Sequence, residues 1–370
     1  MKIAWEISIQ AFPYLTGVEK VQRSLLREMT RIDSENEYFL IAKNEVNFKF
    51  PLPENFKIID ISSKRPTYLW REQLIPSVIK KEKIDVLHSP VSAIPILGEC
   101  KKIATVHELP WMERRRGMET VKQGHKIWLF LNTRFADRIV AVSHRTRQNI
   151  LKLYPESARK IDVIHHGVDP RFETLEIMPD RRTFLNDLSI PDAPFVFFVG
   201  SLRRKKNLAI LLDAFEELAE HDFPLNLVLA GIRNTAWPDL QERVALAPLK
   251  GRVFFPGYIT DRELVVLYNM AEIMVYPSMY EGFGLPPLEA MACGTPVITT
   301  TGGSIPEVVE DAAVLIDPLD KEGLKKALIR FYKDPLLGAE YVRRGYEQVK
   351  KFTWRRAALS YIELYRTLLK

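Results

Sequence analysis

Short apolar runs alternate with amphipathic stretches along the whole chain. The apolar runs predict β-strands, and the amphipathic run at residues 18–29 predicts a helix. Most of the apolar runs are far enough apart to leave room for a crossover helix. The alternation therefore predicts an α/β protein with parallel sheets. The predicted strands are residues 3–9, 38–42, 85–89, 102–108 and 138–143 in the first half, and residues 195–200, 225–231, 252–257, 272–278 and 295–300 in the second.

A polar, proline-rich segment interrupts this alternation near the middle of the chain. Residues 168–192 show no strong period of apolar positions, so the segment predicts a linker. A new series of predicted strands and helices begins on each side of it. A chain of 370 residues is also long enough for two domains of roughly 150 residues each. We therefore expect one domain over residues 1–170, a second over residues 171–352, and a C-terminal helix within residues 353–370.

The composition is that of an ordinary globular protein. Hydrophobic residues make up 46% of the chain and charged residues 27%, which excludes a mainly disordered or fibrous protein. Cys100 and Cys293 cannot form a disulfide framework and fit a reducing compartment. The longest uncharged stretch, residues 290–306, contains proline and glycine and does not predict a membrane helix, and Glu6 interrupts any N-terminal signal. We expect a cytoplasmic protein, and the net charge of +6 hints at anionic partners.

Glycine and basic residues follow several predicted strands of the second half. In an open α/β sheet, ligands bind at the carboxyl ends of the strands, and glycine lets backbone N–H groups approach a ligand closely. The basic run Arg203–Lys206, directly after one such turn, indicates a ligand that carries phosphate. One loop of this kind is more often a solvated helix start, but several at one sheet edge favour a binding site. The loops begin at Gly200, Gly231, Gly257, Tyr276 and Thr301.

Residues 276–298 hold the densest of these signals. Pro286 and Pro287 are typical of the first turn of a helix and Gly294 of its end, so we expect a helix from about Pro286 to Cys293. The N-terminus of such a helix offers unpaired N–H groups and the positive end of the helix dipole. Both features suit a phosphate or another anion.

Two glutamates lie on either side of the start of this helix. Glu281 precedes the loop 282–285, and Glu289 lies about one turn into the helix. We expect both carboxylates to face the same crevice, where each can accept hydrogen bonds from neighbouring hydroxyls of a sugar or a ribose. The spacing alone arises often by chance. The strand, glycine loop, proline start and glycine stop around it make the pattern specific.

At these residues the sequence resembles glycosyltransferase family 4, retaining enzymes of the GT-B fold. The family's E-x7-E motif matches Glu281 to Glu289, and its G-S-L-x-x-(R/K)-K-N pattern matches Gly200–Asn207, with Lys206 as the phosphate-binding base. The resemblance covers nearly the whole chain in the right order. Further matching segments are Thr16–Val18, Thr105–Leu109, Val142–Thr146, His166–Asp169 and Phe352–Trp354.

The resemblance implies two Rossmann-like, doubly wound domains that face a central cleft. The N-terminal domain would hold the acceptor and the domain 171–352 a sugar nucleotide, while helix 353–370 would cross back onto the N-terminal domain. Catalytic roles would fall to Glu281, His107 and Lys206. The implied substrate-binding residues are Gly17, Ser201, Lys205, Gly282, Phe283, Gly284, Leu285 and Glu289.

The implied roles in the second domain divide between sugar, ribose and phosphate. Glu281 would hold hydroxyls of the transferred sugar, and Glu289 would hold the ribose of the nucleotide. Lys206, together with Lys205, would neutralise the diphosphate. The amides of residues 282–285 would contact both the sugar and the phosphate.

Three further positions matter to the resemblance. His107 would lie near the sugar from the N-terminal domain, and Gly17 would let the first loop pass close to the diphosphate and the acceptor. Ser201 departs from the family, which often has arginine directly after the glycine. Neighbouring Lys205 would supply the missing charge.

The implied reaction is transfer of a hexose. Similarity to the subgroup with R-K-N and E-G-F-G-L-P-P sequences favours GDP-mannose as donor and a glycan or lipid-linked acceptor, as in polysaccharide biosynthesis. No Asp-x-Asp pair suits a divalent ion on the donor, so we expect a reaction without metal or cofactor. Two alternatives stay open. One is a glucosyltransferase using UDP-glucose or another UDP-sugar, or a sugar phosphorylase, of the same fold; the other is an inactive partner protein that binds sugar nucleotides.

The sequence also weighs against dinucleotide, NTPase, zinc and nucleic-acid sites. The chain contains no G-x-G-x-x-G or P-loop sequence, which weighs against a dinucleotide oxidoreductase or a P-loop NTPase. His107–Glu108 begins like a zinc-binding motif, but Trp111 stands where the second histidine would be. The pair His165–His166 has no cysteine nearby and fits a turn better than a metal site. We expect no nucleic-acid binding, because basic and aromatic residues form no continuous platform.

The segment Arg114–Arg116 places three arginines beside Trp111 and Met112. It is either a solvated loop or a contact for an anionic acceptor or for lipid headgroups. Peripheral contact with the inner membrane surface is therefore kept as a hypothesis beside the sugar-nucleotide and glycan partners.

Overall fold

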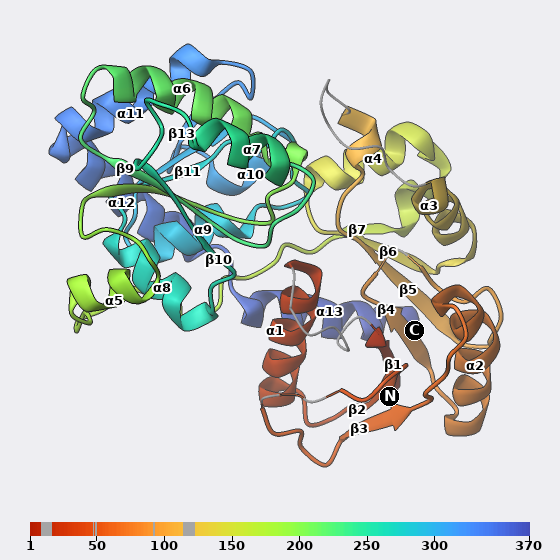
Figure 1. Ribbon diagram of the computed structural model, residues 1–370. Helices are drawn as coiled ribbons and strands as arrows, with labels where there is room; N and C mark the ends of the chain where they lie inside the picture. The colour runs from red at the N-terminus through yellow and green to blue at the C-terminus, as the bar shows by residue number, and fades with distance from the viewer. Residues whose placement is uncertain (9–16, 47, 49, 92, 114–122) are drawn as a thin grey trace. The chain divides into compact units, whose positions relative to one another are not determined.

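The computed structural model describes residues 1–8, 17–46, 48, 50–91, 93–113 and 123–370. These residues divide into two compact units, each built on one parallel sheet (Figure 1). Of the described residues, the first unit contains those within Met1–Met112, Val121–Gly167 and Thr353–Lys370, and the second contains Glu113 and Val168–Phe352. The C-terminal segment thus belongs to the same unit as the N-terminus.

The described residues of the first unit form a sheet of seven strands. They are β1 (Lys2–Glu6), β2 (Glu37–Ala42), β3 (Phe56–Asp60), β4 (Val86–Ser89), β5 (Lys101–Val106), β6 (Arg138–Ala141) and β7 (Ile161–Val163). Their order in the sheet is β3-β2-β1-β4-β5-β6-β7, and all neighbours are parallel. The inner strands β1 and β2 are almost fully buried, whereas the edge strand β3 is mostly exposed. This contrast is expected when helices cover both faces of a parallel sheet.

Helices from both ends of the chain accompany this sheet. They are α1 (Gly17–Ile32), α2 (Thr67–Glu82), α3 (Gln123–Phe135), α4 (His144–Leu153) and α13 (Trp354–Leu368), with the short 3-10 helices η2 (Pro110–Glu113) and η3 (Pro155–Lys160). The hydroxyl of Thr353 caps the start of α13 by accepting a hydrogen bond from the N–H of Arg356. Helix α13 packs against α1, at the opposite end of the sequence (Figure 1). It buries Tyr361 and Tyr365 on its packed side.

The described residues of the second unit form a six-stranded parallel sheet. Its strands are β8 (Phe195–Val199), β9 (Asn226–Ala230), β10 (Val253–Gly257), β11 (Ile273–Tyr276), β12 (Val297–Thr300) and β13 (Val314–Ile316), in the order β10-β9-β8-β11-β12-β13. Its helices are α5 (Arg181–Asp187), η4 (Arg204–Lys206), α6 (Leu208–Glu220), α7 (Trp237–Val244), α8 (Asp261–Met270), α9 (Leu285–Ala292), α10 (Ile305–Val309), α11 (Lys321–Lys333) and α12 (Pro335–Val349). Among the described helices of both units, none has the length and apolar character needed to cross a membrane.

The strand orders confirm the prediction of two Rossmann-like α/β domains. In the second sheet the chain winds outward from β8 to β10 in one direction and from β11 to β13 in the other. The connections after β8 and β11 therefore start side by side at the carboxyl edge of the sheet and then run in opposite directions. Such a switch point is where ligands bind in open α/β sheets.

The segment 168–192, which the sequence predicts as a linker, contains a helix. Part of this segment forms α5, whose first turn is capped by Asp180, and the segment buries Leu185 and Ile190 in the second unit. A helix of seven residues spans about two turns, so its apolar positions repeat too few times to show a helical period.

Candidate functional site

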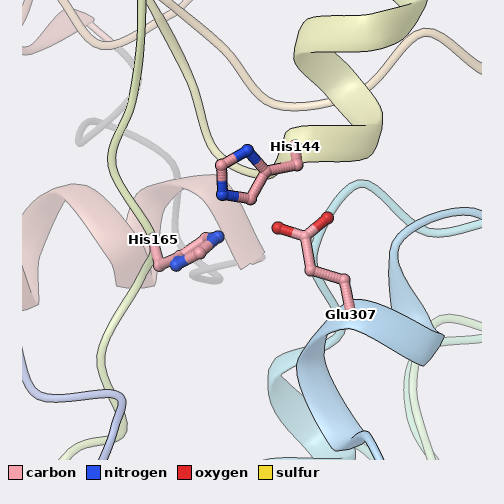
Figure 2. Close-up of side chains that lie close together, drawn as sticks. All are labelled: His144, His165 and Glu307. Carbon is pink, nitrogen blue, oxygen red and sulfur yellow. The ribbon is translucent and has the colours of Figure 1, made fainter.

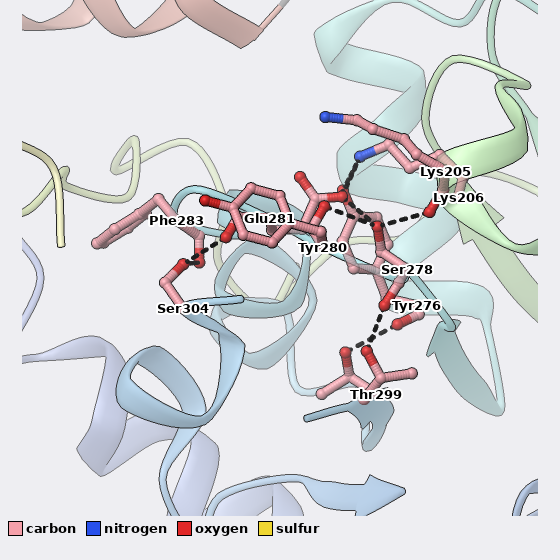
Figure 3. A network of polar contacts seen from close by, with 10 residues as sticks. Lys205, Lys206, Tyr276, Ser278, Tyr280, Glu281, Phe283, Thr299 and Ser304 are labelled. Carbon is pink, nitrogen blue, oxygen red and sulfur yellow. Dashed lines mark hydrogen bonds and ion pairs between the residues drawn. The ribbon is translucent and has the colours of Figure 1, made fainter. Parts of the chain in front are cut away.

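Two loops meet at the switch point of the second sheet (Figure 3). The chain after β8 turns into η4, which ends at Lys206, and the chain after β11 runs through Ser278 to Glu281. The backbone N–H of Met279 donates a hydrogen bond of 2.9 Å to the carbonyl of Lys205. This bond ties the two loops together, because it joins segments that follow neighbouring strands.

The described protein groups that bind the carboxylate of Glu281 all bind the same one of its two oxygens. Its Oε1 accepts hydrogen bonds from Lys206 Nζ at 2.5 Å, from Ser278 Oγ at 2.5 Å and from Tyr276 OH at 3.2 Å. No hydrogen bond to Oε2 comes from the described residues. A carboxylate oxygen with two lone pairs is therefore left to accept hydrogen bonds from a ligand.

Lys206 is the buried cation of the site. Its Nζ donates to Glu281 Oε1 and, at 2.5 Å, to Tyr276 OH, so two of its three N–H groups bind protein atoms described in the structure. Only 9% of its surface is exposed, whereas the neighbouring Arg203 and Arg204 lie at the surface. Of the basic run predicted to bind phosphate, Lys206 is thus the member whose ammonium reaches Glu281.

The pKa of Glu281 reflects this arrangement. Burial alone would raise the pKa, but the ammonium charges of Lys206 and Lys205, with the hydrogen bonds from Lys206 and Ser278, lower it to about 2. Burial raises the pKa of Tyr276 far above its usual range, and the charge of Glu281 adds to that effect. At neutral pH Glu281 is therefore an ionised carboxylate and Tyr276 a neutral phenol.

A layer of hydroxyls on and after β12 supports the backbone of the Glu281 loop (Figure 3). Thr299 Oγ1 donates to the carbonyl of Tyr276 at 2.8 Å, and Thr300 Oγ1 donates to that of Ser278 at 2.5 Å. Ser304 donates from its backbone N–H and its Oγ to the carbonyl of Glu281, at 3.0 and 3.1 Å. These bonds fix the backbone of the loop that carries the Glu281 carboxylate.

Gly303 makes this support sterically feasible. Its φ is +67°, and a Cβ at this position would lie 2.2 Å from the carbonyl oxygen of Glu281 and 2.7 Å from its nitrogen. Only glycine lets the two backbones approach so closely without displacing one of them.

Glu289 lies on α9, which begins at Leu285, one residue before the predicted start. The preceding Gly284 has a φ of +99°, a conformation that favours glycine. Tyr268 OH donates to Glu289 Oε2 at 3.2 Å, so this carboxylate has a different phenol partner from Glu281. The charges of both glutamates contribute to the raised pKa of Tyr276. Glu289 and Glu281 therefore both act electrostatically on Tyr276, although they share no hydrogen-bond partner among the described residues.

The remaining predicted residues of the second unit border this site. Ser201 follows β8, is half-buried, and its carbonyl accepts a hydrogen bond of 2.7 Å from Arg203 N. Lys205 contributes charge to Glu281 and a carbonyl to Met279. Gly282 and Phe283 continue the loop from Glu281 toward α9 and are buried.

His107 belongs to the first unit, where it follows β5. Its Nε2 lies 2.7 Å from the carbonyl oxygen of Pro90 and must carry the proton, because a carbonyl only accepts. Burial lowers the pKa of His107, while that hydrogen bond and the charges of Glu108 and Glu19 only partly oppose the effect. The ring is therefore neutral at pH 7, with Nδ1 as a hydrogen-bond acceptor.

Gly17 is the first residue of α1 and is exposed. A Cβ at this position would meet no described atom within 4 Å, so packing among the described residues does not require glycine there. Residues 9–16, including Thr16 of the matching segment, lie outside the described residues. The contact of this loop with substrate stays a prediction.

Histidines cluster near the carboxyl edge of the first sheet. Figure 2 shows His144, at the start of α4, beside His165, with ring centroids 5.5 Å apart; Glu307, also drawn, belongs to the second unit. The ring of His166 lies 5.4 Å from that of His107 and 5.8 Å from that of Trp354. His166 is thus buried against aromatic and imidazole rings, next to the turn at Gly167.

Two family models match the chain. The model for Glycosyltransferase Family 4 matches residues 16–172, and the model for glycosyl transferases group 1 matches residues 180–350. Alpha-maltose-1-phosphate synthase of Mycobacterium tuberculosis (strain ATCC 25618 / H37Rv) is 30% identical over 296 residues, which cover 73% of this chain and 74% of that protein. The chain belongs to glycosyltransferase family 4.

Two mannosyltransferases of Escherichia coli are also similar to this family 4 chain. O-antigen chain mannosyltransferase B is 31% identical over 239 residues, covering 63% of this chain and 61% of that protein. Serotype-specific mannosyltransferase WbdA is 30% identical over 242 residues, covering 64% of this chain and 29% of that protein. The matched region therefore spans less than two thirds of either mannosyltransferase.

Solved structures confirm the predicted GT-B fold class. The HepE protein of Anabaena in complex with UDP-glucose has a TM-score of 0.77 at 18% identity, covering 99% of this chain and all of that one. Sucrose-phosphate synthase of Thermosynechococcus elongatus has a TM-score of 0.76 at 21% identity, covering all of this chain and 99% of that one. At these identities the likeness concerns the fold.

Sequence reasoning missed the residues that hold the family 4 glutamate in place. The sequence marks the loop that begins at Tyr276 but does not show that Tyr276 and Ser278 bind Glu281. It also marks the loop that begins at Thr301 but does not show that Gly303 in this loop packs against the backbone of Glu281. Ser304 was not singled out. The available signal was that polar residues and glycines follow two adjacent strands, whose ends must meet at one sheet edge.

Proposed function

We propose that the chain is a retaining glycosyltransferase that moves mannose from GDP-mannose to a glycan or lipid-linked acceptor without a metal ion. The observation that carries the proposal is the buried contact of Lys206 with Glu281 at the switch point of the second sheet. In this contact a carboxylate oxygen of Glu281 that can accept hydrogen bonds from hydroxyls lies beside the ammonium group of Lys206, which can donate to phosphate. A sugar nucleotide carries those two groups side by side.

Glu281 would bind the sugar through Oε2. Because Oε1 already accepts three hydrogen bonds from protein groups, the carboxylate cannot rotate without breaking them. Hydrogen bonds to a charged group contribute roughly 1.5–3 kcal/mol each. Two sugar hydroxyls on Oε2 would therefore fix the orientation of the ring as well as add affinity.

Lys206 would bind the diphosphate through its third N–H. Negative charge grows on the leaving phosphate while the bond from the sugar C1 to the phosphate oxygen breaks. A fixed ammonium group and the N-terminal amides of α9, which follow Gly284, are suited to stabilise that charge because they need no reorganisation during the reaction.

Retention would follow from attack on the same face of the sugar. The acceptor oxygen forms its bond to C1 on the side from which the diphosphate departs, and the acceptor proton passes to the leaving phosphate oxygen. This account needs no protein nucleophile. It leaves His107, with its neutral ring and free Nδ1 lone pair, to accept a hydrogen bond from a sugar hydroxyl.

The choice of GDP-mannose rests on the two mannosyltransferases among the relatives. A UDP-glucose donor is the principal competitor, and an inactive nucleotide-binding protein is the competitor of another class. Intact Glu281, Lys206 and Glu289 favour an active transferase over the inactive protein.

The test combines thermal shift with donor hydrolysis. The protein is mixed with GDP, GDP-mannose, UDP or UDP-glucose, and each donor is also assayed for slow release of its nucleoside diphosphate. We expect stabilisation by GDP and GDP-mannose and hydrolysis of GDP-mannose alone. The variant Glu281→Gln should hydrolyse it at least tenfold more slowly, since a neutral amide holds the hydroxyls less tightly.

A matched control is Glu272→Gln, at the exposed position directly before strand β11. It should hydrolyse GDP-mannose like the unmodified protein. Stabilisation and hydrolysis with UDP-glucose instead would contradict the donor assignment, and donor binding without hydrolysis or transfer would identify an inactive binder. Equal hydrolysis by Glu281→Gln would refute the role given to Glu281.

The acceptor and the place of the reaction are proposed from the resemblance. A lipid-linked acceptor would bring the enzyme to the inner face of a membrane as a peripheral protein. The segment Arg114–Arg116, which raised this hypothesis in the sequence, lies outside the described residues.

A further inference from the structure

The charge excess of the chain is concentrated in one segment of the first unit. Residues 123–160, from α3 through η3, contain eight Lys and Arg against two Asp and Glu. Their net charge of +6 equals that of the whole chain, so the remaining residues are neutral on balance. One of the two acids, Asp137, is paired with Lys101 outside the segment at 3.1 Å.

The same segment exposes large apolar side chains. Ile127 and Phe130, one turn apart on α3, are 58% and 52% exposed, and Leu153 at the end of α4 is 40% exposed. The ring centroids of Phe130 and Tyr154 lie 6.2 Å apart, so the α3 side chains continue into those at the end of α4. We call Ile127, Phe130, Leu153 and Tyr154 the apolar patch.

Exposed cations surround the apolar patch. Lys126 and Arg134 lie four residues before and after Phe130 and therefore share its face of α3. Lys152 adjoins Leu153 on α4. Lys160 reaches the last turn of α3, where its Nζ donates to the carbonyl of Ala136 at 3.1 Å. We call Lys126, Arg134 and Lys152 the basic frame.

We propose that the apolar patch and its basic frame bind a surface of anionic phospholipid. Apolar side chains framed by Lys and Arg suit a membrane interface, because the apolar tips enter the acyl boundary while the cations face the lipid phosphates. An acidic protein would match the charge but would not require several large apolar side chains inside the frame. The binding involves neither the sugar-nucleotide site of the second unit nor Arg114–Arg116.

The test is co-sedimentation of the full chain with vesicles. Vesicles of phosphatidylcholine alone are compared with vesicles of phosphatidylcholine and phosphatidylglycerol, at low and high salt. We expect binding to the anionic vesicles that weakens with salt. The double variant Ile127→Ser/Phe130→Ser should bind at least tenfold more weakly. Lys126→Ser/Arg134→Ser should bind roughly 30-fold more weakly, which corresponds to about 1 kcal/mol for each charge.

Matched controls come from the second unit. Leu336→Ser removes an apolar side chain that is 83% exposed on α12, and Arg182→Ser/Lys250→Ser removes two exposed cations. Both should bind vesicles like the unmodified chain, and all variants should keep its far-UV circular dichroism and its donor hydrolysis in solution. The donor assay therefore separates failure of this proposal from failure of the proposed function.

Two results would overturn the proposal. One is an unmodified chain that fails to bind anionic vesicles, and the other is an apolar-patch variant that binds them as tightly as the unmodified chain. Retention on a polyglutamate resin through Lys126 and Arg134, without vesicle binding, would identify an acidic protein as the partner instead.

Discussion

Lys206 and Glu281, 75 positions apart in the sequence, form an ion pair of 2.5 Å in which both side chains are about nine-tenths buried. Each group makes the burial of the other tolerable, since an isolated buried charge would be strongly unfavourable. Because the pair uses only Oε1 of the carboxylate and one N–H of the ammonium group, it leaves both residues able to bind a ligand. The same contact therefore stabilises the fold and prepares the proposed site.

Replacing Lys206 by methionine should reduce kcat/KM for the proposed donor by roughly tenfold to a hundredfold or more. The reason is that a charge-assisted hydrogen bond contributes roughly 1.5–3 kcal/mol, and here it would form with the leaving phosphate. Steady-state kinetics with GDP-mannose measure the effect. Arg204→Met is the matched control, because Arg204 is exposed in the same turn and pairs with Asp239. Equal losses in the two variants would show that only the net charge of the turn matters.

The pH dependence of the Lys206→Met variant should differ from that of the unmodified chain. With Lys206 present, the pKa of Glu281 is about 2, so the carboxylate stays ionised down to about pH 3. Without it, the effect of burial is opposed by Lys205 and by the hydrogen bonds from Ser278 and Tyr276, and the pKa rises. Donor binding by the variant should therefore weaken at a higher pH as acid is added.

The free energy of unfolding of the unmodified chain should decrease in strong acid for the same reason. A depressed carboxylate pKa adds stability above the usual value of 4.5, and this stability is lost as the pH falls through about 2.

Titration of donor binding from pH 7 to pH 4 measures the difference in pH dependence between Lys206→Met and the unmodified chain. Superimposable titrations of the variant and the unmodified chain would show that Lys206 does not set the ionisation of Glu281.

The inner strands of both sheets were predictable because they are buried on both faces and read as continuous apolar runs. The strands β3, β7 and β13 were not predicted, and all three lie at sheet edges. Strand β3 exposes Lys57, Asp60 and even the apolar Ile58, and β7 and β13 are only three residues long. An edge strand has one neighbour and more solvent, so its sequence carries a weaker apolar signal.

The candidate site was predictable in its residues but not in their contacts. Local motifs single out Glu281 and Lys206, because each sits in a turn with a recognisable pattern. That the two bind each other depends on which strands are neighbours, and spacing along the chain does not contain that information. The same holds for Ser278, whose hydroxyl has no motif of its own and acts only through the fold.

Replacing Gly303 by alanine should disturb the position of Glu281. The added Cβ would lie 2.2 Å from the carbonyl oxygen of Glu281, so one of the two backbones must move. We expect at least a tenfold loss of donor affinity in addition to a lower Tm. Gly251→Ala is the matched control, since its φ of +77° is equally unfavourable but the added Cβ would meet no other described residue within 4 Å beyond its chain neighbours. This control should lose about 1–2 kcal/mol of stability and keep donor affinity. Similar donor affinity in both variants would argue against the steric account.

His88 should make the first unit sensitive to acid. It is fully buried in β4, its Nδ1 lies 2.7 Å from Tyr365 OH and its Nε2 lies 2.8 Å from Thr105 Oγ1. Burial, with a smaller contribution from the charge of His107, lowers its pKa from 6.5 to about 3. Below pH 6.5 the unfolded chain therefore binds a proton that the folded chain does not. Stability is full above that pH and falls by about 1.4 kcal/mol per pH unit as acid is added.

The variant His88→Gln should remove this dependence, because glutamine can still donate and accept hydrogen bonds but does not titrate. Urea unfolding at several pH values measures the free energy of unfolding. Between pH 6 and pH 4.5, the unmodified chain should lose about 2 kcal/mol more than the variant does. His221→Gln, at an exposed position in the second unit, should lose stability with acid as the unmodified chain does. If His88→Gln and the unmodified chain lose stability equally, His88 takes up its proton in the folded protein as readily as in the unfolded one.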